Sequence, residues 1–386
     1  MRDLSWVGTW SQSLSDHSFL QYHGQNQTLR AVIRISLGGS QVRVRFSNRY
    51  GKQPLKIDEA SIALAGDGIS IQSHTIQQIT FSSQADVTLS EGSEVISDPV
   101  VLPVPALARL AVSIYFEQPV AFETANLGQG DIYGSIPGNH VVADNEPFLP
   151  FSPVQVEQTG IELPPPLPFI AGIDVLTAAH SRAIVAFGDS ITAGGWPAML
   201  AERLNGLGMA HVGVLNQGLG GNRVLHSGVG PIGYAFGLAG VTRFQRDVLE
   251  QAGVRSVIVL HGINDIIHPG VIAPKEEEVS AQEIVSGMEQ YATWAHEKNI
   301  RIIVANLLPF EGHQDWKPER EDKLQMVNAL IQSSQAFDGI LDLAAVMRDP
   351  AFPTRLLPAY DSGDHLHPDP QGLRAIAEAV DLNWFI

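Results

Sequence analysis

The stretch Ala183-Ile-Val-Ala-Phe-Gly-Asp-Ser190 decides the fold of the C-terminal half of the chain. It begins with a continuous apolar run, which is typical of a strand buried on both faces of a parallel sheet. The run ends at Gly188 and Asp189, both turn-forming residues, and a helical pattern follows from Pro197. A buried strand that leads into a helix is the repeating unit of an α/β fold.

The same alternation of strand and helix continues to the C-terminus. We expect further strands at 212–215, 256–260, 300–305 and 339–343, and helices at 197–207, 241–251, 281–298, 318–336 and 370–383. Strands that alternate with helices predict a parallel sheet, here of five strands, with both faces covered. In such sheets ligands bind beyond the carboxyl ends of the strands.

Residues 1 to about 135 follow a different pattern, that of short strands. Gln41-Val-Arg-Val-Arg-Phe-Ser47 alternates apolar and polar residues, and so does 30–36. The Leu37-Gly-Gly-Ser40 turn between them is a hairpin signal. Turn-forming residues separate further strand-like pieces at 60–65, 70–79, 87–89 and 110–116. This spacing is typical of a sandwich or barrel, and we expect an all-β sandwich of jelly-roll type.

A proline-rich segment connects the two halves. Its residues, 136–170, include the run Pro164-Pro-Pro-Leu-Pro168. Proline cannot occupy central strands or helix interiors, so we expect an extended surface connection with room for one edge strand, and the ordinary interpretation of the proline run is a stiff linker. The predicted domains are therefore 1–178, a β-sandwich with its connection, and 179–386, an α/β domain.

Composition excludes several classes of function. The chain of 386 residues has no cysteine, which rules out disulfides and thiolate chemistry. Its formal net charge of −17 disfavours nucleic acid and anionic lipid as partners. No apolar run is long enough for a membrane span, and no signal peptide is visible. We expect a cytoplasmic protein as the chain stands, or a secreted one if a signal peptide was removed.

Four motifs fall at the expected strand ends. Gly188-Asp-Ser-Ile-Thr192 follows the first strand, Asn216-Gln-Gly-Leu-Gly-Gly-Asn-Arg223 the second, and His261-Gly-Ile-Asn-Asp265 the third. Asp361-Ser-Gly-Asp-His-Leu-His-Pro368 precedes the last helix. Taken singly, each has an ordinary structural interpretation: a helix cap, a flexible loop, an Asn-Asp turn and a histidine-rich surface turn.

Together the four motifs predict a nucleophilic hydrolase. Ser190 would attack, His367 would take its proton, and Asp364 would orient the imidazole. The oxyanion hole would consist of the N–H groups of Ser190 and Gly221 and the side-chain amide of Asn264. A metal site formed by Asp364, His365 and His367 is the less favoured interpretation, because no further ligand cluster supports it.

Residues near these motifs are candidates for substrate binding. They are Trp196, at the start of the first helix, and Asn222 and Arg223 in the glycine-rich loop. Arg223 and Arg243 either meet a polar substrate or pair with surface carboxylates.

The four blocks resemble those of the SGNH hydrolases, the GDSL lipase and esterase superfamily, in which Ser190, Gly221, Asn264 and His367 would be the signature residues. The resemblance covers residues 183 to 386. It implies a flavodoxin-like α/β/α domain that hydrolyses esters with no metal or organic cofactor.

A closer resemblance links the chain to a bacterial subgroup similar to xylanase-associated esterases, many of them carbohydrate acetyl esterases. Gly220-Gly-Asn-Arg223 and Arg243-Phe-x-Arg-Asp247 carry it in the C-terminal half, and Arg45-Phe-Ser-Asn-Arg-Tyr-Gly51 in the N-terminal half. At position 193 this chain has Ala, whereas many members of the subgroup have Asp or Glu. This resemblance implies release of acetyl or other short acyl groups from a saccharide ester.

Two other functions stay open at this point. One is a lipase or thioesterase that acts on longer acyl chains. The other is a carbohydrate-binding protein without catalytic activity. The oligomeric state is not predicted.

Overall fold

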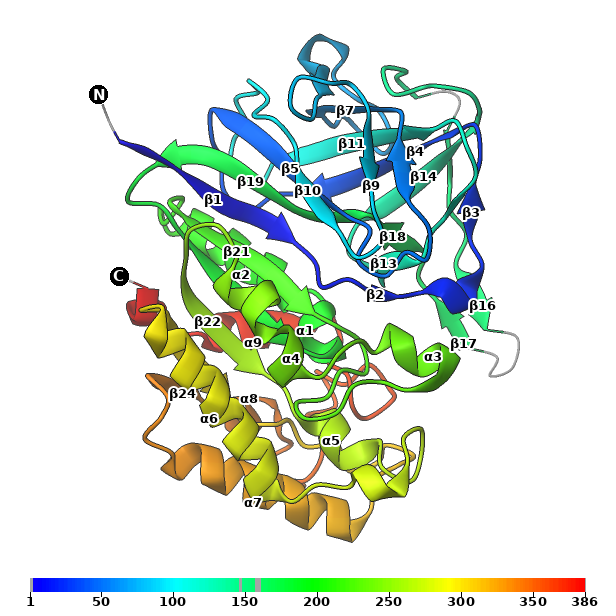
Figure 1. Cartoon of the computed structure of the whole chain (residues 1–386). Helices are drawn as coiled ribbons and strands as arrows, with labels where there is room; N and C mark the ends of the chain where they lie inside the picture. Colours follow the sequence, from blue (N-terminus) through cyan, green and yellow to red (C-terminus); the bar gives the residue numbers. More distant parts are fainter. Residues whose placement is uncertain (1–2, 146–147, 157–160, 386) are drawn as a thin grey trace. The chain divides into compact units, whose positions relative to one another are not determined.

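The computed structural model describes residues 3–145, 148–156 and 161–385. Their contacts divide the chain into two compact units, Met1–Ser181 and Arg182–Ile386 (Figure 1). The sequence predicts a division after residue 178, which is where the last strand of the N-terminal unit ends. Each unit has its own sheets and its own core.

The N-terminal unit consists of antiparallel sheets. Its longer strands are β1 (Leu4–Ser11), β4 (Gln27–Arg34), β5 (Gln41–Ser47), β7 (Glu59–Leu64), β8 (Gln77–Ile79), β10 (Glu94–Ile96), β11 (Arg109–Phe116), β14 (Asp131–Pro137), β15 (Phe148–Pro150) and β19 (Ile170–Ala178). They form one sheet in the order β15-β14-β4-β11-β7-β8 and another in the order β1-β19-β5-β10. The predicted all-β class is confirmed.

Shorter elements complete this unit. They are the strands β2 (Ser15–Asp16), β3 (His23–Gly24), β6 (Leu55–Ile57), β9 (Val87–Leu89), β12 (Val120–Ala121), β13 (Thr124–Leu127), β16 (Val154–Val156), β17 (Ile161–Leu163) and β18 (Pro166–Pro168), with the 3₁₀ turns η1 (Ser18–Leu20) and η2 (Ser73–Thr75). Of the predicted strand 70–79, only the last part forms a strand, as β8.

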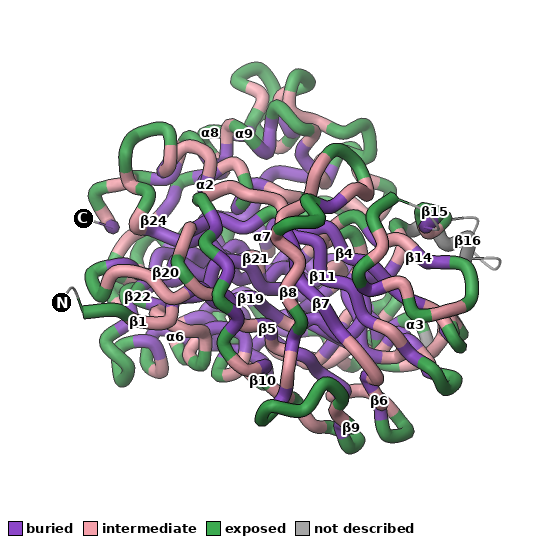
Figure 2. Tube along the Cα trace, turned by 90° about the horizontal axis from the view of Figure 1, so that it is seen from above, coloured by how far each residue is buried: buried purple, intermediate pink, exposed green. Residues whose placement is uncertain are grey.

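The core of the N-terminal unit follows from the alternating pattern. In β5 the side chains of Val42, Val44 and Phe46 are fully buried, while the residues between them are partly exposed. In β11 and β7 both faces are largely buried, and Figure 2 shows these strands mostly in the colour of buried residues.

The predicted hairpin at Leu37-Gly-Gly-Ser40 is wrong. β4 pairs with β11 and β14, whereas β5 pairs with β19 and β10, so the turn carries the chain from one sheet to the other. Strands from distant parts of the sequence occupy the pairing edges that a hairpin would need. The residues of the turn carry no information about which distant strands pair with β4 and β5.

The proline run is not a stiff linker, but it contains an edge strand of the kind expected in this segment. Pro166 to Pro168 form β18, which is buried and pairs with β13 at the edge of a three-stranded sheet. An edge position explains why proline is tolerated there, because no second neighbour needs its missing N–H.

The C-terminal unit is an α/β sandwich around a five-stranded parallel sheet. Its strands are β20 (Arg182–Gly188), β21 (Val212–Gly218), β22 (Val254–Leu260), β23 (Arg301–Ala305) and β24 (Gly339–Leu341). Their spatial order is β21-β20-β22-β23-β24, which is the order of flavodoxin-like sheets. The sheet order reverses beside β20, so the point where ligands bind in such folds lies at the end of β20. The predicted fold class is confirmed.

Helices cover this sheet. They are α1 (Ser190–Ala193), α2 (Trp196–Gly206), α3 (Gly230–Ala235), α4 (Gly240–Phe244), α5 (Ile263–Ile267), α6 (Ala281–Glu297), α7 (Pro318–Ser333), α8 (Leu343–Met347) and α9 (Pro370–Ala379), with a π-helical turn η3 (Gln245–Leu249) and the 3₁₀ turns η4 (Lys275–Glu277) and η5 (Leu382–Phe385). The predicted helix 241–251 is thus a short α-helix, α4, followed by the π-helical turn η3. The predicted helix 370–383 ends earlier, at Ala379.

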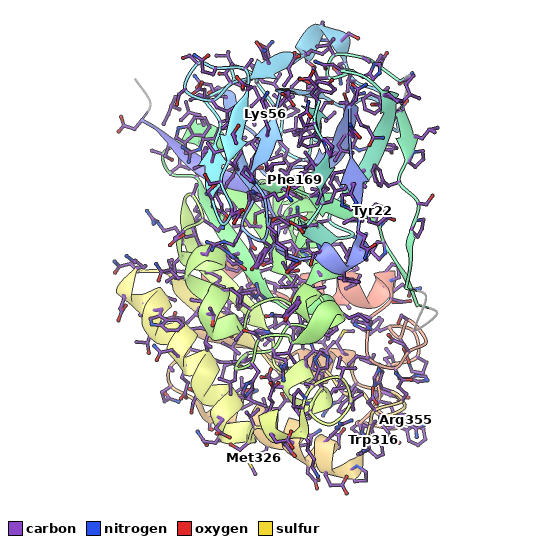
Figure 3. All side chains as sticks on the ribbon, turned by 45° about the vertical axis from the view of Figure 1, so that its right-hand side comes forward. Tyr22, Lys56, Phe169, Trp316, Met326 and Arg355 are labelled. Atoms are coloured by element: carbon purple, nitrogen blue, oxygen red, sulfur yellow. The ribbon has the colours of Figure 1, made fainter. Side chains whose placement is uncertain are left out.

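Local sequence signals account for several helix ends. Ser280 and Glu283 form a capping box at the start of α6. Asp369 caps α9, and Pro318 begins α7. Helix α2 packs against α9 and β21, and α6 packs against α7 and β23. Met326, labelled in Figure 3, marks the exposed side of α7.

Candidate active site

The turn after β20 carries Ser190. Gly188 is required here because a Cβ at this position would lie 2.0 Å from the carbonyl oxygen of Leu260 on the neighbouring strand β22. Asp189 then caps α1 by accepting the Ile191 N–H at 3.1 Å. Burial raises the pKa of Asp189 to about 7. Ser190, the first residue of α1, is partly exposed.

Ser190 is hydrogen-bonded to His367, although 177 positions separate them in the sequence. Its Oγ lies 2.8 Å from Nε2 of His367. The other ring nitrogen, Nδ1, lies 2.6 Å from Oδ2 of Asp364. The three side chains thus form one continuous chain of hydrogen bonds. An imidazole in this position can accept the serine proton while the carboxylate stabilises the resulting charge.

Asp364 is held ionised by its surroundings. Burial by itself would raise its pKa, but hydrogen bonds to the carboxylate from the His367 N–H, the His367 ring and the Leu366 N–H outweigh that effect. The pKa of Asp364 therefore lies below its usual range. Hydrogen bonds donated to a carboxylate favour its charged form.

A second aspartate–histidine pair lies in the same loop. Nδ1 of His365 is 2.6 Å from Oδ2 of Asp361, and the His365 backbone has a φ of 65°. Each histidine thus has its own aspartate. Within the described part of the chain, no group of three or more such side chains is arranged to hold a metal ion.

The glycine-rich loop lies against the serine turn. The Leu219 N–H donates to the Gly188 carbonyl oxygen at 3.1 Å, which ties the end of β21 to the end of β20. Gly221 has a φ of +70°, a conformation that favours glycine. A Cβ on Gly221 would lie 2.3 Å from the ring of Phe236, so this ring packs directly on the Gly221 backbone.

Asn264 reaches the same loop from the third strand end. It is buried in α5, directly after β22, and its Nδ2 donates to the Asn222 carbonyl oxygen at 3.0 Å. Three hydrogen bonds therefore link the four predicted blocks. They join Ser190 to His367, Leu219 to Gly188, and Asn264 to Asn222.

Among the candidate substrate-binding residues, Asn222 and Arg223 have protein partners. The Asn222 amide donates to the carbonyl oxygens of Phe236 and Leu238. Arg223 forms an ion pair with Glu277 at 2.6 Å and is almost fully buried. Both side chains hold the loop in shape.

The expectation for Trp196 needs correction. Its side chain has no exposed surface and packs in the core beside the start of α2. An indole enclosed in this way offers no face to a substrate, which is the common fate of tryptophan in folded proteins.

Three residues of this region were not singled out by the sequence. Asp265 accepts the N–H groups of Val224 and Leu225, and burial raises its pKa to about 6. Phe236 contacts Gly221, and its ring lies 5.4 Å from that of His268. Burial lowers the pKa of His268 to about 3, so this histidine is neutral at physiological pH. The position of Asp265 directly after Asn264 could have pointed to it in the sequence. No feature of the sequence around Phe236 sets it apart from other phenylalanines.

Within the described residues, no helix has both the length and the apolar character that crossing a membrane requires.

The sequence matches one family of known proteins. Residues 186–375 match the model of the GDSL-like lipase/acylhydrolase family. No curated protein matches the sequence.

Several solved structures are similar to part of the chain. A GDSL-like lipase from Bacteroides thetaiotaomicron is 19% identical, with a TM-score of 0.38, over 51% of this chain and 85% of its own. The acetyl xylan esterase AlAXEase is 17% identical, with a TM-score of 0.40, over 53% and 100%. A catalytic mutant of Axe2, an acetylxylan esterase from Geobacillus stearothermophilus, is 18% identical, with a TM-score of 0.41, over 51% and 91%.

The family match spans the strand ends at which the four sequence blocks meet. The C-terminal unit of this chain is a domain of the GDSL-like lipase/acylhydrolase family, and the protein is a hydrolase of the GDSL type.

Proposed function

We propose that this protein is a serine carboxylic ester hydrolase that works through Ser190, His367 and Asp364 and an acyl-enzyme. The observation that carries the proposal is the unbroken hydrogen-bond chain from Ser190 Oγ through the His367 ring to Asp364. This chain supplies the nucleophile, a base within reach of its proton, and a carboxylate that orients the base.

In the first half of the reaction, Ser190 Oγ attacks the ester carbonyl carbon and His367 Nε2 takes the serine proton. The tetrahedral oxyanion is stabilised by the N–H groups of Ser190 and Gly221 and by the Asn264 amide. Collapse expels the alcohol, which receives the proton from His367, and leaves the acyl group on Ser190. In the second half, His367 activates a water molecule that releases the acid and restores the serine.

We further propose that the substrate is an acetyl or other short acyl ester of a saccharide. The packing of Phe236 on Gly221 supports a small acyl group, because the ring occupies space next to a proposed oxyanion donor. The sequence motifs shared with xylanase-associated esterases support a saccharide as the alcohol part. A neutral sugar also suits a chain with a formal net charge of −17.

The test uses p-nitrophenyl acetate, a chain-length series of p-nitrophenyl esters and a panel of acetylated sugars, with the released acid measured. Wild-type protein is expected to hydrolyse the acetate, and Ser190→Ala is expected to lose this activity. A fluorophosphonate should label wild type but not Ser190→Ala. Full activity in Ser190→Ala would overturn the mechanism, and a preference for eight carbons or more would overturn the short-acyl substrate. A wild-type protein that is neither active nor labelled would indicate a binding protein.

A further inference from the structure

Arg243 is a fully buried cation beside the candidate site. Its guanidinium donates from Nε to Oδ1 of Asn222 at 2.9 Å, from Nη1 to the Gln217 carbonyl oxygen at 3.0 Å, and from Nη2 to the Gly188 carbonyl oxygen at 2.6 Å. Nη1 also lies 3.0 Å from Oδ2 of Asp247, one turn along the same helical segment. The guanidinium also stacks over the ring of Phe187, 4.0 Å from its centroid.

These acceptors belong to the segments that carry two of the three proposed oxyanion donors, Ser190 and Gly221. Gly188 lies two residues before Ser190 at the end of β20. Gln217 and Asn222 flank Gly221 on either side, in β21 and in the loop after it. One planar group therefore fixes both ends of the glycine-rich loop against the turn that presents Ser190.

The network extends to the third proposed donor. Asn222, whose side chain accepts from Arg243, also accepts the Asn264 amide through its carbonyl oxygen. Gly221 lies directly before Asn222 in the chain. A shift of Asn222 would thus displace Gly221 and Asn264 at once.

Burying an arginine side chain in this way costs free energy. Removing a cation from water is unfavourable, and burial lowers the pKa of Arg243 even with Asp247 beside it. Buried ion pairs are often no more stabilising than apolar residues of similar volume. The stability of the fold therefore does not explain why an arginine is buried at this position. The directions of its N–H donors do explain it, because they reach acceptors on two segments at once.

We propose that Arg243 is a positioning residue that sets the geometry of the oxyanion hole, by fixing the Gly221 loop relative to the Ser190 turn. This inference rests on the proposed function. It differs from both sequence-based expectations for Arg243, contact with a polar substrate or pairing with a surface carboxylate, since the side chain is buried and its carboxylate partner Asp247 is buried too.

Lysine cannot replace arginine in this role. Its ammonium is a compact charge, whereas the guanidinium has donors in a fixed planar fork that reaches acceptors in several directions at once. In Arg243→Lys the charge is kept but the alignment of the two segments is lost. Because misplacement of about 1 Å can cost roughly 100-fold in rate, we expect kcat to fall by about 10- to 100-fold with little change in KM.

The matched control is Arg30→Lys. Arg30 is also fully buried, donates to Ser113 and to the Ala143 and Asp144 carbonyl oxygens, and stacks on Phe148, but it belongs to the N-terminal unit. This variant should lower the melting temperature while kcat per labelled site stays at the wild-type value. It separates the effect of disturbing a buried arginine from the effect of misaligning the proposed oxyanion donors.

The experiment measures kcat and KM on p-nitrophenyl acetate, the rate of fluorophosphonate labelling and the melting temperature for wild type, Arg243→Lys, Arg243→Ala and Arg30→Lys. In Arg243→Lys the labelling rate should fall together with kcat, because the phosphonyl adduct uses the same donors. Added guanidinium should restore part of the activity of Arg243→Ala.

Two results would overturn the inference. One is a kcat of Arg243→Lys, per labelled site, equal to that of wild type. The other is a loss of the same size in Arg30→Lys. If Arg243→Ala does not fold, the Lys variant still decides the matter. A wild-type protein without ester hydrolysis or labelling would instead overturn the proposed function itself, so the two failures are distinguishable.

Discussion

Oδ2 of Asp364 lies 2.6 Å from Nδ1 of His367, and the Leu366 and His367 N–H groups donate to Oδ1 of the same carboxylate. The loop therefore orients the carboxylate and the imidazole together. This arrangement fixes which ring nitrogen carries the proton, and it leaves Nε2 to face Ser190.

The first prediction concerns this pair. Asp364→Asn keeps the size of the side chain but removes the charge that stabilises an imidazolium. By analogy with other triads we expect kcat on p-nitrophenyl acetate to fall by about 100- to 10,000-fold. The matched control is Asp361→Asn, since Asp361 lies at the same 2.6 Å distance from His365 in the same loop. Equal losses in the two variants would remove Asp364 from the mechanism.

The second prediction concerns the backbone of Gly221. In Gly221→Ala the new Cβ would lie 2.3 Å from the Phe236 ring, and the φ of +70° costs an L-residue about 1–2 kcal/mol. We expect the loop to shift and kcat to fall by about 10- to 100-fold, with most of the folded protein retained.

The control for this variant is its neighbour. A Cβ at Gly220 would meet no atom within 4 Å, so Gly220→Ala should leave kcat near the wild-type value. Steady-state kinetics on p-nitrophenyl acetate compare the two. If both substitutions were tolerated equally, Gly221 would not be a donor to the oxyanion.

The third prediction concerns acyl size. Phe236→Ala removes the ring that packs on Gly221 and opens space beside the proposed oxyanion hole. We expect the ratio of kcat/KM for butyrate over acetate esters to rise by about 10-fold, the scale of methylene discrimination in an apolar pocket. Tyr234→Ala is the control, because Tyr234 lies on the neighbouring helix α3 and is half exposed. An unchanged ratio in Phe236→Ala would place the acyl group elsewhere.

The fourth prediction concerns the pH dependence of stability. Burial raises the pKa of Asp189 to about 7 in the folded protein, against roughly 3.9 in the unfolded chain. Between these values the folded state holds the proton more tightly, so this group makes the free energy of unfolding fall as pH rises from about 4 to 7. Each pKa unit of difference corresponds to about 1.4 kcal/mol.

Asp189→Asn removes this titration and keeps an oxygen that can accept the Ile191 N–H. The variant should gain stability over wild type as pH rises through that window, and the gain should be constant above it. Denaturant unfolding at pH 5 and pH 8 measures the difference. Asp98→Asn is the control: hydrogen bonds from the Ser83 N–H and the Thr80 hydroxyl hold the pKa of Asp98 below its usual range, so this carboxyl is already ionised at pH 5 and its variant should show the same stability difference from wild type at pH 5 and pH 8. A stability difference for Asp189→Asn that does not change with pH would contradict the assigned pKa.

Local sequence was sufficient for much of the C-terminal unit. The apolar runs of β20 and β22 and the caps of α6 and α9 are short-range signals, and the predicted elements lie close to the observed ones. The N-terminal unit was harder to predict in detail. The partners of β4 and β5 come from β11, β14, β19 and β10, and alternation along one strand carries no information about which distant strand will pair with it.

The sequence by itself determined which chemical groups follow each parallel strand, because the carboxyl ends of parallel strands must share one edge of a sheet. It thereby brought the blocks of Ser190, Gly221 and Asn264 to one edge. Only the tertiary structure decided how they are held there: that the Asn264 amide donates to the Asn222 carbonyl oxygen, and that Arg243 lies buried between the strand ends. An asparagine in a turn and an arginine in a helix look the same in sequence wherever they point. Their roles depend on packing between segments far apart in the chain.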